Sequence, residues 1–270
     1  MNVALIASLI AFVCSLSWEH SVRRYLDGFD DAIIPANTTP EQRVDAILRW
    51  MREGPPRSTG EFPTGLSNRD PETTLNYQKL LSVCGTATNA FLNLARNSDL
   101  EARRLLLLTP HRTTKHVVAE VLLRGQWIVV DPTYRIIMRN SKGEMLTRKD
   151  LQNADIFVEA TKEIPYYPSS YTYESVAHVR LAKLPLDGFH LRPILDAIFP
   201  GWEEAADWSL LLERESFLAL TISSLMTIFL LLVRFVLAWY ADRRLSIQRF
   251  RLRSRLHRAR AVFFGTPEIK

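Results

Sequence analysis

A long uncharged apolar run near the C-terminus is the clearest pattern in the chain. Residues 217–233 carry no charged side chain, and the apolar character resumes after Arg234 through Tyr240. At about 1.5 Å per residue, a helix over this stretch crosses a hydrocarbon core of roughly 30 Å. A buried helix of a soluble domain is the alternative, but such a helix rarely lacks a polar face over this length. We therefore predict a transmembrane helix at residues 216–240.

A second, shorter apolar segment occupies the N-terminus. Residues 1–18 have no Lys or Arg ahead of the apolar stretch and no small-residue cleavage motif. These features favour a transmembrane signal anchor over a cleaved signal peptide. Cys14 lies inside this segment, whereas Cys84 lies in the soluble region, so we expect no disulfide between the two cysteines.

The positive charge of the chain is concentrated in its tail. Residues 234–270 contain ten basic and two acidic side chains, whereas the preceding residues are net negative. Eight arginines follow the predicted span, and the positive-inside rule then makes the tail 241–270 cytoplasmic. Arg23 and Arg24 favour the opposite orientation, but they are outnumbered. We expect both termini inside the inner (cytoplasmic) membrane and residues 19–215 outside, on the periplasmic side.

The basic tail raises two other possibilities. It could lie on anionic lipid as an amphipathic helix, or it could bind nucleic acid. Topology already accounts for the arginines without either role. We therefore expect membrane lipid as a partner of the chain and no nucleic acid.

Two amphipathic helices are predicted in the soluble region. The first has Thr39 as N-cap, Pro40 at its first position and a stop at Gly54. Its apolar face consists of Val44, Ile47, Leu48 and Met51. The second runs from Cys84 to Arg96 and has a face of Ala87, Ala90, Phe91 and Leu94. This spacing is typical of helices buried on one side.

Three extended segments follow the second helix. They cover residues 102–110, 116–123 and 127–134, and all are rich in aliphatic side chains. The last two are joined through a short loop at Arg124 and Gly125, which predicts a β-hairpin. The order of elements is helix, strand, strand, strand.

The rest of the soluble region is less regular. We predict a short helix at 147–152 and an aromatic segment at 166–175, whose tyrosines either cover a substrate groove or pack the domain edge. Residues 54–74 are rich in Gly, Pro, Ser and Thr and form a long loop that could border a cleft. The soluble domain is assigned to 19–184, and a membrane-proximal linker to 185–215.

Three residues suggest a nucleophilic site. A thiol attacks a carbonyl as its thiolate, which the N-terminus of a helix stabilises, and Cys84 opens the second helix. A histidine can accept the thiol proton, and a carboxylate can hold the imidazole in one tautomer. His116 opens one strand of the hairpin, and Asp131 lies near the end of the next. Asp131 precedes Pro132, so its role could also be confined to turn formation.

The hairpin loop decides whether His116 and Asp131 can meet. Alternate residues of a strand share a face. A two-residue or four-residue loop at Arg124 and Gly125 places Asp131 opposite Val118, with His116 two residues away on the same face. A three-residue loop would put the two side chains on opposite faces. The triad hypothesis therefore requires a loop of even length or a bulge.

These motifs together resemble the core of bacterial transglutaminase-like domains. The resemblance covers roughly residues 40–135 and rests on the Cys84-Gly85 helix start, the runs RWMREG and SDLEARRLLL, and the motif HVVAEVLLRGQWIVVDPTY. It implies an α+β, papain-like fold in which the Cys helix packs on an antiparallel sheet. It also implies acyl-thioester chemistry on amides, with Cys84, His116 and Asp131 as the triad.

The remaining parts of the site are less well defined. The backbone N–H of Cys84 is one candidate donor to an oxyanion, and Gln78, six residues upstream, is a speculative second. The sequence has no Cys/His cluster with metal-ligand spacing. We therefore expect no metal and no cofactor.

Two classes of function fit this reading. The first is a membrane-anchored cysteine enzyme that acts on peptide or protein amides, as a peptidase or amidase with water as acceptor, or as a protein-glutamine acyltransferase with an amine. The second is a catalytically silent binding or assembly module, part of a cell-envelope protein complex. A third reading is a membrane assembly factor whose working end is the cytoplasmic arginine tail.

Overall fold

The computed structural model describes the chain in several segments. These are residues 1–55, 57–61, 70–178, 191–200, 202, 211 and 214–244. The chain divides into two compact units, one of Met1–Phe12 with Ile222–Lys270 and the other of Val13–Thr221. Most of the predicted basic tail, from residue 245 onward, and most of the predicted linker lie outside the described residues.

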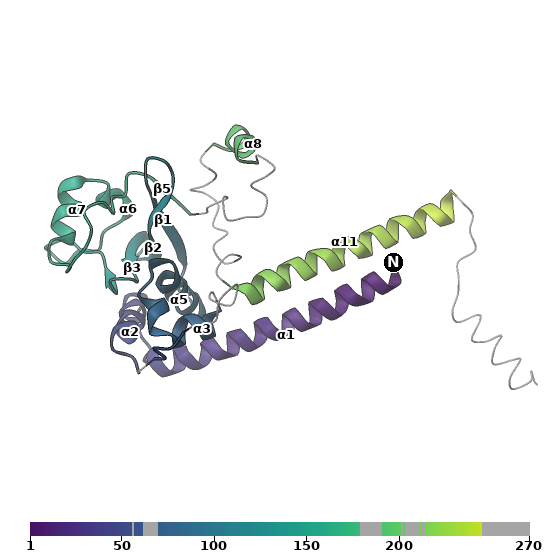
Figure 1. Ribbon diagram of the computed structural model, residues 1–270, viewed down its shortest axis with the longest axis horizontal. Helices are drawn as coiled ribbons and strands as arrows, with labels where there is room; N and C mark the ends of the chain where they lie inside the picture. Colours follow the sequence, from purple (N-terminus) through teal and green to yellow (C-terminus); the bar gives the residue numbers. More distant parts are fainter. Residues whose placement is uncertain are drawn as a thin grey trace, which may run out of the picture. The chain divides into compact units, whose positions relative to one another are not determined.

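A five-stranded antiparallel sheet forms the centre of the larger unit (Figure 1). Its spatial order is β4-β3-β2-β1-β5. The strands are β1 (Ala102–Leu108), β2 (Thr114–Leu123), β3 (Gln126–Asp131), β4 (Ile136–Ile137) and β5 (Val176–Ala177). The three longer strands were predicted from the sequence, whereas two-residue strands are too short to show an alternating pattern.

The hairpin of β2 and β3 has the predicted even loop. Leu123 pairs with Gln126 and Ala119 pairs with Val130, which leaves two residues in the turn. Both turn residues have positive φ, 52° at Arg124 and 78° at Gly125. This is the type I′ geometry that matches the twist of the flanking strands.

One face of the sheet is covered by helices α2 and α5 (Figure 1). Helix α2 (Pro40–Glu53) has a capping box between Thr39 and Gln42, and the four predicted apolar residues are buried. Helix α5 (Cys84–Asn97) packs against β1 and β2. The shared core includes Phe91, Leu94, Ala119, Val121 and Val130. The predicted Cys helix on an antiparallel sheet is confirmed.

The opposite face carries the shorter helices α6 (Arg148–Leu151) and α7 (Ala154–Thr161). Its core includes Leu105, Leu107, Val118, Phe157 and Tyr173. Helix α6 lies within the short helix predicted at 147–152, and Thr147 is its N-cap. The predicted loop at 54–74 is shorter, because α3 (Pro71–Asn76) begins behind an Asp70 cap and leads into α4 (Gln78–Leu81). Position 56 and positions 62–69 lie outside the described residues.

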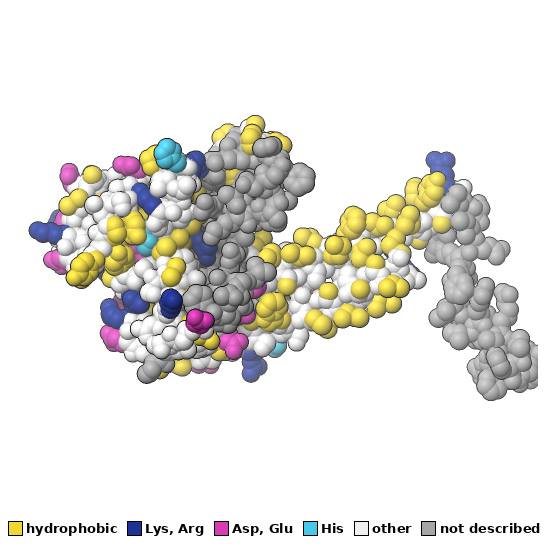
Figure 2. All heavy atoms as spheres, viewed as in Figure 1, with side chains coloured by type: hydrophobic (Ala, Val, Ile, Leu, Met, Phe, Trp, Pro, Cys, Tyr) yellow, Lys and Arg dark blue, Asp and Glu magenta, His cyan; other side chains and the backbone are white. Residues whose placement is uncertain are grey.

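Two long helices carry the apolar termini. Helix α1 covers Asn2–Ile33 and α11 covers Glu215–Arg243. Both are long and apolar enough to cross a membrane, and hydrophobic side chains line their exposed surfaces (Figure 2). The predicted boundary at residue 18 is not a break in the helix. Helix α1 continues because Val22 and Leu26, one turn apart, are buried in the core of the larger unit.

A buried polar network joins three elements of the larger unit. Arg214 Nη1 donates to Glu19 Oε1 of α1 (2.8 Å), and Ser216 Oγ donates to Glu19 Oε2 (2.7 Å). Arg214 Nε donates to Asn93 Oδ1 of α5 (3.0 Å). All four residues are buried. The ion pair therefore ties the start of α11 and the middle of α1 to the helix that begins with Cys84.

Removing one charge of this network should destabilise the protein strongly. Glu19→Ala leaves Arg214 as an uncompensated buried charge, which costs about 3–5 kcal/mol. The control Glu53→Ala removes a partner of Arg52 at an exposed pair and should cost about 0–1 kcal/mol. Thermal unfolding of the detergent-solubilised chain measures both. Equal losses in the two variants would contradict the role of the network.

Candidate active site

Cys84 is the first residue of α5, and its thiol is free and partly exposed. The first N–H groups of a helix have no partner within the helix, and they favour a negative charge placed beside them. The N-cap, Val83, makes no side-chain capping bond. The local structure therefore presents a thiol at a helix N-terminus whose donors are not occupied by a cap.

The start of α5 contacts the part of β2 that does not pair with β3. Strand β3 pairs with β2 only from Ala119 onward, so β3 leaves the earlier residues of β2 without a partner on that side. The buried hydroxyl of Thr88 in α5 donates to the carbonyl of Val117 (3.0 Å). The backbone N–H of Val117 also contributes to a lowered pKa of the Cys84 thiol. Both backbone groups of Val117 thus interact with the first turns of α5.

His116 lies next to this edge and is held by Asp131. His116 Nε2 and Asp131 Oδ2 are 2.8 Å apart, and both side chains are buried. The other carboxylate oxygen of Asp131 accepts the backbone N–H groups of Thr133 (3.0 Å) and Tyr134 (3.3 Å). Asp131 therefore serves both the turn and the histidine, because its two oxygens point to different partners.

The electrostatics couple the thiol and the imidazole. The interaction with His116 is the largest cause that lowers the pKa of Cys84, and burial opposes it. Burial lowers the pKa of His116, but hydrogen bonds and charges from Asp131 and Cys84 outweigh it and raise the pKa to about 9. Both shifts favour a thiolate beside an imidazolium. His116 Nδ1 is the nitrogen left for the thiol, since Nε2 is used by Asp131.

A tyrosine cluster covers the histidine. The ring of Tyr171 lies parallel to that of His116, with centroids 4.1 Å apart and planes 8° apart. Tyr134 and Tyr167 approach the imidazole edge-on at 6.3 Å and 6.5 Å. The segment at 166–175 thus packs into the core at Tyr173, which is fully buried, and covers His116 at Tyr171. A substrate groove beneath its tyrosines stays a prediction.

Glu120 and Trp127 of the sequence motif support the sheet and do not contact the triad. Glu120 Oε2 accepts Arg103 Nε from the neighbouring strand (2.7 Å), and the Arg103 guanidinium lies 4.0 Å from the ring centre of Trp127. His178 is also buried, and its Nδ1 lies 2.6 Å from the carbonyl oxygen of Arg104, the residue after Arg103 on β1. The motif therefore mixes site residues with packing residues.

Gln78 lies at the start of α4, and its side chain is exposed. Its backbone N–H donates to the carbonyl of Ser58 (3.2 Å). Its role in an oxyanion hole stays a prediction. Among the described residues no group of His, Cys, Asp and Glu is arranged to hold a metal ion.

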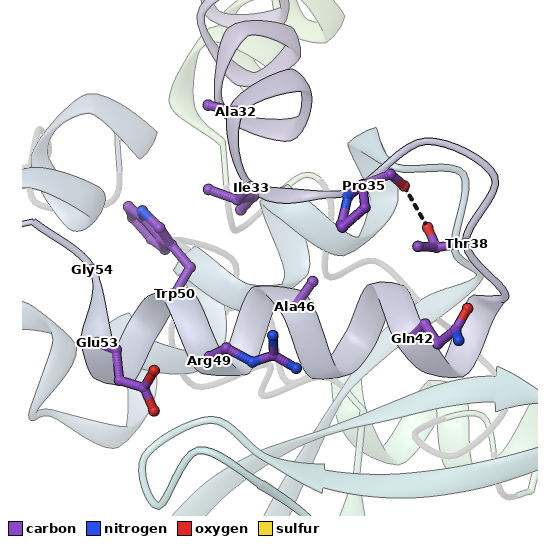
Figure 3. A pocket seen from close by; sticks show the side chains of 10 residues that line it. All are labelled: Ala32, Ile33, Pro35, Thr38, Gln42, Ala46, Arg49, Trp50, Glu53 and Gly54. Carbon is purple, nitrogen blue, oxygen red and sulfur yellow. Dashed lines mark hydrogen bonds between the residues drawn. The ribbon is translucent and has the colours of Figure 1, made fainter.

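A pocket of about 470 Å³ lies away from the triad, between the end of α1 and helix α2 (Figure 3). Trp50 and Arg49 of α2 line it together with Ile33 of α1. At its other end the hydroxyl of Thr38 donates to the carbonyl of Pro35 (3.0 Å). None of the predicted site residues lines this pocket.

The Thr88 hydrogen bond gives a test of how the nucleophile is positioned. Thr88→Val keeps the shape of the side chain but leaves the Val117 carbonyl without its donor, which costs about 1–3 kcal/mol. The alkylation rate of Cys84 should also fall in this variant, because the start of α5 loses its hydrogen bond to β2. The control Thr38→Val removes an exposed hydroxyl and should change stability by less than about 0.5 kcal/mol. Equal stability and thiol reactivity in the two variants would show that the bond does not position Cys84.

One comparison with known proteins found a match. Residues 27–132 match the model of the transglutaminase-like superfamily. The match contains α2, α5 and strands β1 to β3, and so includes Cys84 of α5, His116 of β2 and Asp131 of β3. No curated protein and no solved structure matches the chain. Residues 27–132 are thus similar to the transglutaminase-like superfamily.

Proposed function

We propose that the protein is a membrane-anchored cysteine enzyme that acts on amide bonds of peptides or proteins through a thioester on Cys84. The observation that carries the proposal is the bond from His116 Nε2 to Asp131 Oδ2, which leaves Nδ1 for a thiol at a helix N-terminus. A binding module that needed only the fold would have no use for a lowered thiol pKa beside a raised histidine pKa.

The first half of the reaction forms an acyl-enzyme. The Cys84 thiolate attacks the carbonyl carbon of the amide and forms a C–S bond, and the carbonyl electrons move onto oxygen. When the carbonyl re-forms, the C–N bond breaks and His116 gives its proton to the leaving amine. Asp131 keeps the imidazole in the orientation needed for this transfer.

The second half releases the acyl group. Water or an amine attacks the thioester, His116 takes its proton, and the thiolate of Cys84 leaves. Water gives a carboxylic acid, as in a peptidase or amidase, and an amine gives a new amide, as in a protein-glutamine acyltransferase. Backbone N–H groups at the start of α5, with that of Cys84 among them, are the proposed donors to the oxyanion in both steps, since no side chain caps this helix.

Thiol labelling across pH tests the proposal. In a Cys14→Ser background, alkylation of Cys84 by iodoacetamide should persist well below the free-thiol pKa of about 8.5, because the imidazolium stabilises the thiolate. His116→Ala should lower the rate below pH 7 by about tenfold or more and restore an ordinary thiol profile. The control His111→Ala changes an exposed histidine and should leave the profile unchanged. An ordinary profile in the unmutated protein would favour the binding-module alternative.

We infer that both termini lie in the cytoplasm and that the domain faces the periplasmic side of the inner membrane. Two helices long and apolar enough to span a membrane support this topology, with eight arginines after the second. The bond between Glu19 and Arg214 also supports it, because it joins the middle of α1 to the residue just before α11 in one buried cluster of the domain. The substrates would then be peptides or proteins of the cell envelope, with membrane lipid around the helices.

Protease protection in oriented membrane vesicles tests the topology. In right-side-out vesicles a protease should digest the domain while a C-terminal epitope tag stays intact, because the arginine tail lies inside. Inside-out vesicles should show the reverse. A tag that is digested in right-side-out vesicles would overturn the orientation.

A further inference from the structure

The stacking of Tyr171 on His116 carries an inference that rests on the proposed function. The two rings are nearly parallel, 8° apart, at a centroid distance of 4.1 Å. Asp131 holds the imidazole at its Nε2 edge, and the tyrosine covers one of its faces. The hydrogen bond restrains one edge of the imidazole, and the tyrosine restrains the tilt of its plane.

The segment around Tyr171 is fixed to the domain on both sides. Lys115 Nζ, from the residue just before His116, donates to Thr172 Oγ1, from the residue just after Tyr171 (2.8 Å). Tyr173 is fully buried, and its carbonyl accepts Gln152 Nε2 (3.4 Å). The backbone N–H of Tyr171 donates to the carbonyl of Pro168 (3.1 Å). These contacts hold the backbone of residues 171–173 in place, and so keep the Tyr171 ring over His116.

We propose that Tyr171 is a positioning residue for the thioester chemistry, whose ring holds the imidazole of His116 in plane and stabilises its protonated form beside the Cys84 thiolate. Two neutral aromatic rings prefer an offset or edge-on arrangement to a face-to-face one. A cation, in contrast, is attracted to the face of an aromatic ring. The close parallel stack is thus better suited to an imidazolium than to a neutral imidazole.

The surroundings of the phenol agree with this placement. Burial raises the pKa of Tyr171, and the negative charges of Cys84 and Asp131 raise it further. The ring therefore stays neutral at working pH and keeps its electron-rich face. Tyr171 is half-buried and packs against the edge of the core cluster that contains the fully buried Tyr173. Thermal melting of each variant therefore separates a loss of stability from a loss of thiol activation.

The test compares variants that separate the ring from the hydroxyl. Tyr171→Leu removes the aromatic face, and Tyr171→Phe keeps it. Tyr166→Leu is the matched control, since this tyrosine lies in the same segment, is 97% exposed and makes no ring contact with His116. The readout is the pH profile of Cys84 alkylation in the full-length chain with Cys14→Ser, with thermal melting recorded for each variant.

We expect Tyr171→Leu to narrow, by about 0.5–1 pH unit, the pH range in which Cys84 is alkylated as a thiolate beside the imidazolium. The alkylation rate below pH 7 should fall about three- to tenfold. Tyr171→Phe and Tyr166→Leu should follow the unmutated protein within about twofold, since both keep the stacked ring. A Tyr171→Leu profile that superimposes on the control overturns the proposal. A loss in Tyr171→Phe equal to that in Tyr171→Leu also overturns it, because the hydroxyl and not the ring would then act.

The two proposals fail in distinguishable ways. If Cys84 of the unmutated protein titrates as an ordinary thiol, the proposed function fails and the role of Tyr171 falls with it. If Cys84 is activated through His116 but Tyr171→Leu changes nothing, only the role of the tyrosine fails. The same alkylation assay reports both results.

Discussion

The hydrogen bond between His116 and Asp131 depends on the register of one hairpin, and the site depends on that bond. The two-residue turn at Arg124 and Gly125 sets the pairing, which puts both side chains on one face of the sheet. A shift by one residue would turn one of the two side chains to the other face. Such a shift would also expose the apolar partners of β2, so the core and the site select the same register.

The end of β3 at Asp131 has a second consequence. Because β3 pairs only from Ala119 onward, the Val117 backbone is free to bind the start of α5. The Thr88 hydroxyl donates to the Val117 carbonyl, and the Val117 N–H lowers the pKa of the Cys84 thiol. The start of the Cys84 helix is thus joined to β2, the strand that carries His116, through the Thr88 hydroxyl and the backbone of Val117. The pair is held together by elements that are far apart in the chain.

The buried pair of Glu19 and Arg214 relates this site to the rest of the chain. It joins α1 and the start of α11 to Asn93 of the Cys helix. A buried ion pair contributes little net stability relative to an apolar packing, but it specifies which segments meet. Here it brings together residues almost two hundred positions apart.

The sequence alone determined the elements whose signals are local. Periodicity and capping located α2 and α5, the turn residues located the hairpin, and the uncharged run at 217–233 located α11. The motifs around Cys84, His116 and Asp131 also indicated the transglutaminase-like superfamily. Each of these signals lies within a few residues or within one hairpin, which is why it could be read without a structure.

The tertiary structure decided what depends on long-range packing. The stack of Tyr171 on His116 joins residues 55 positions apart, and neither residue carries a local signal for the other. The same is true of the Glu19 network and of the full length of α1, whose second half is helical because Val22 and Leu26 find a core to pack against. Two-residue strands such as β5 form only where a neighbouring strand already offers its edge. Such contacts are chosen by the fold as a whole, since many sequences could supply a tyrosine or a glutamate there.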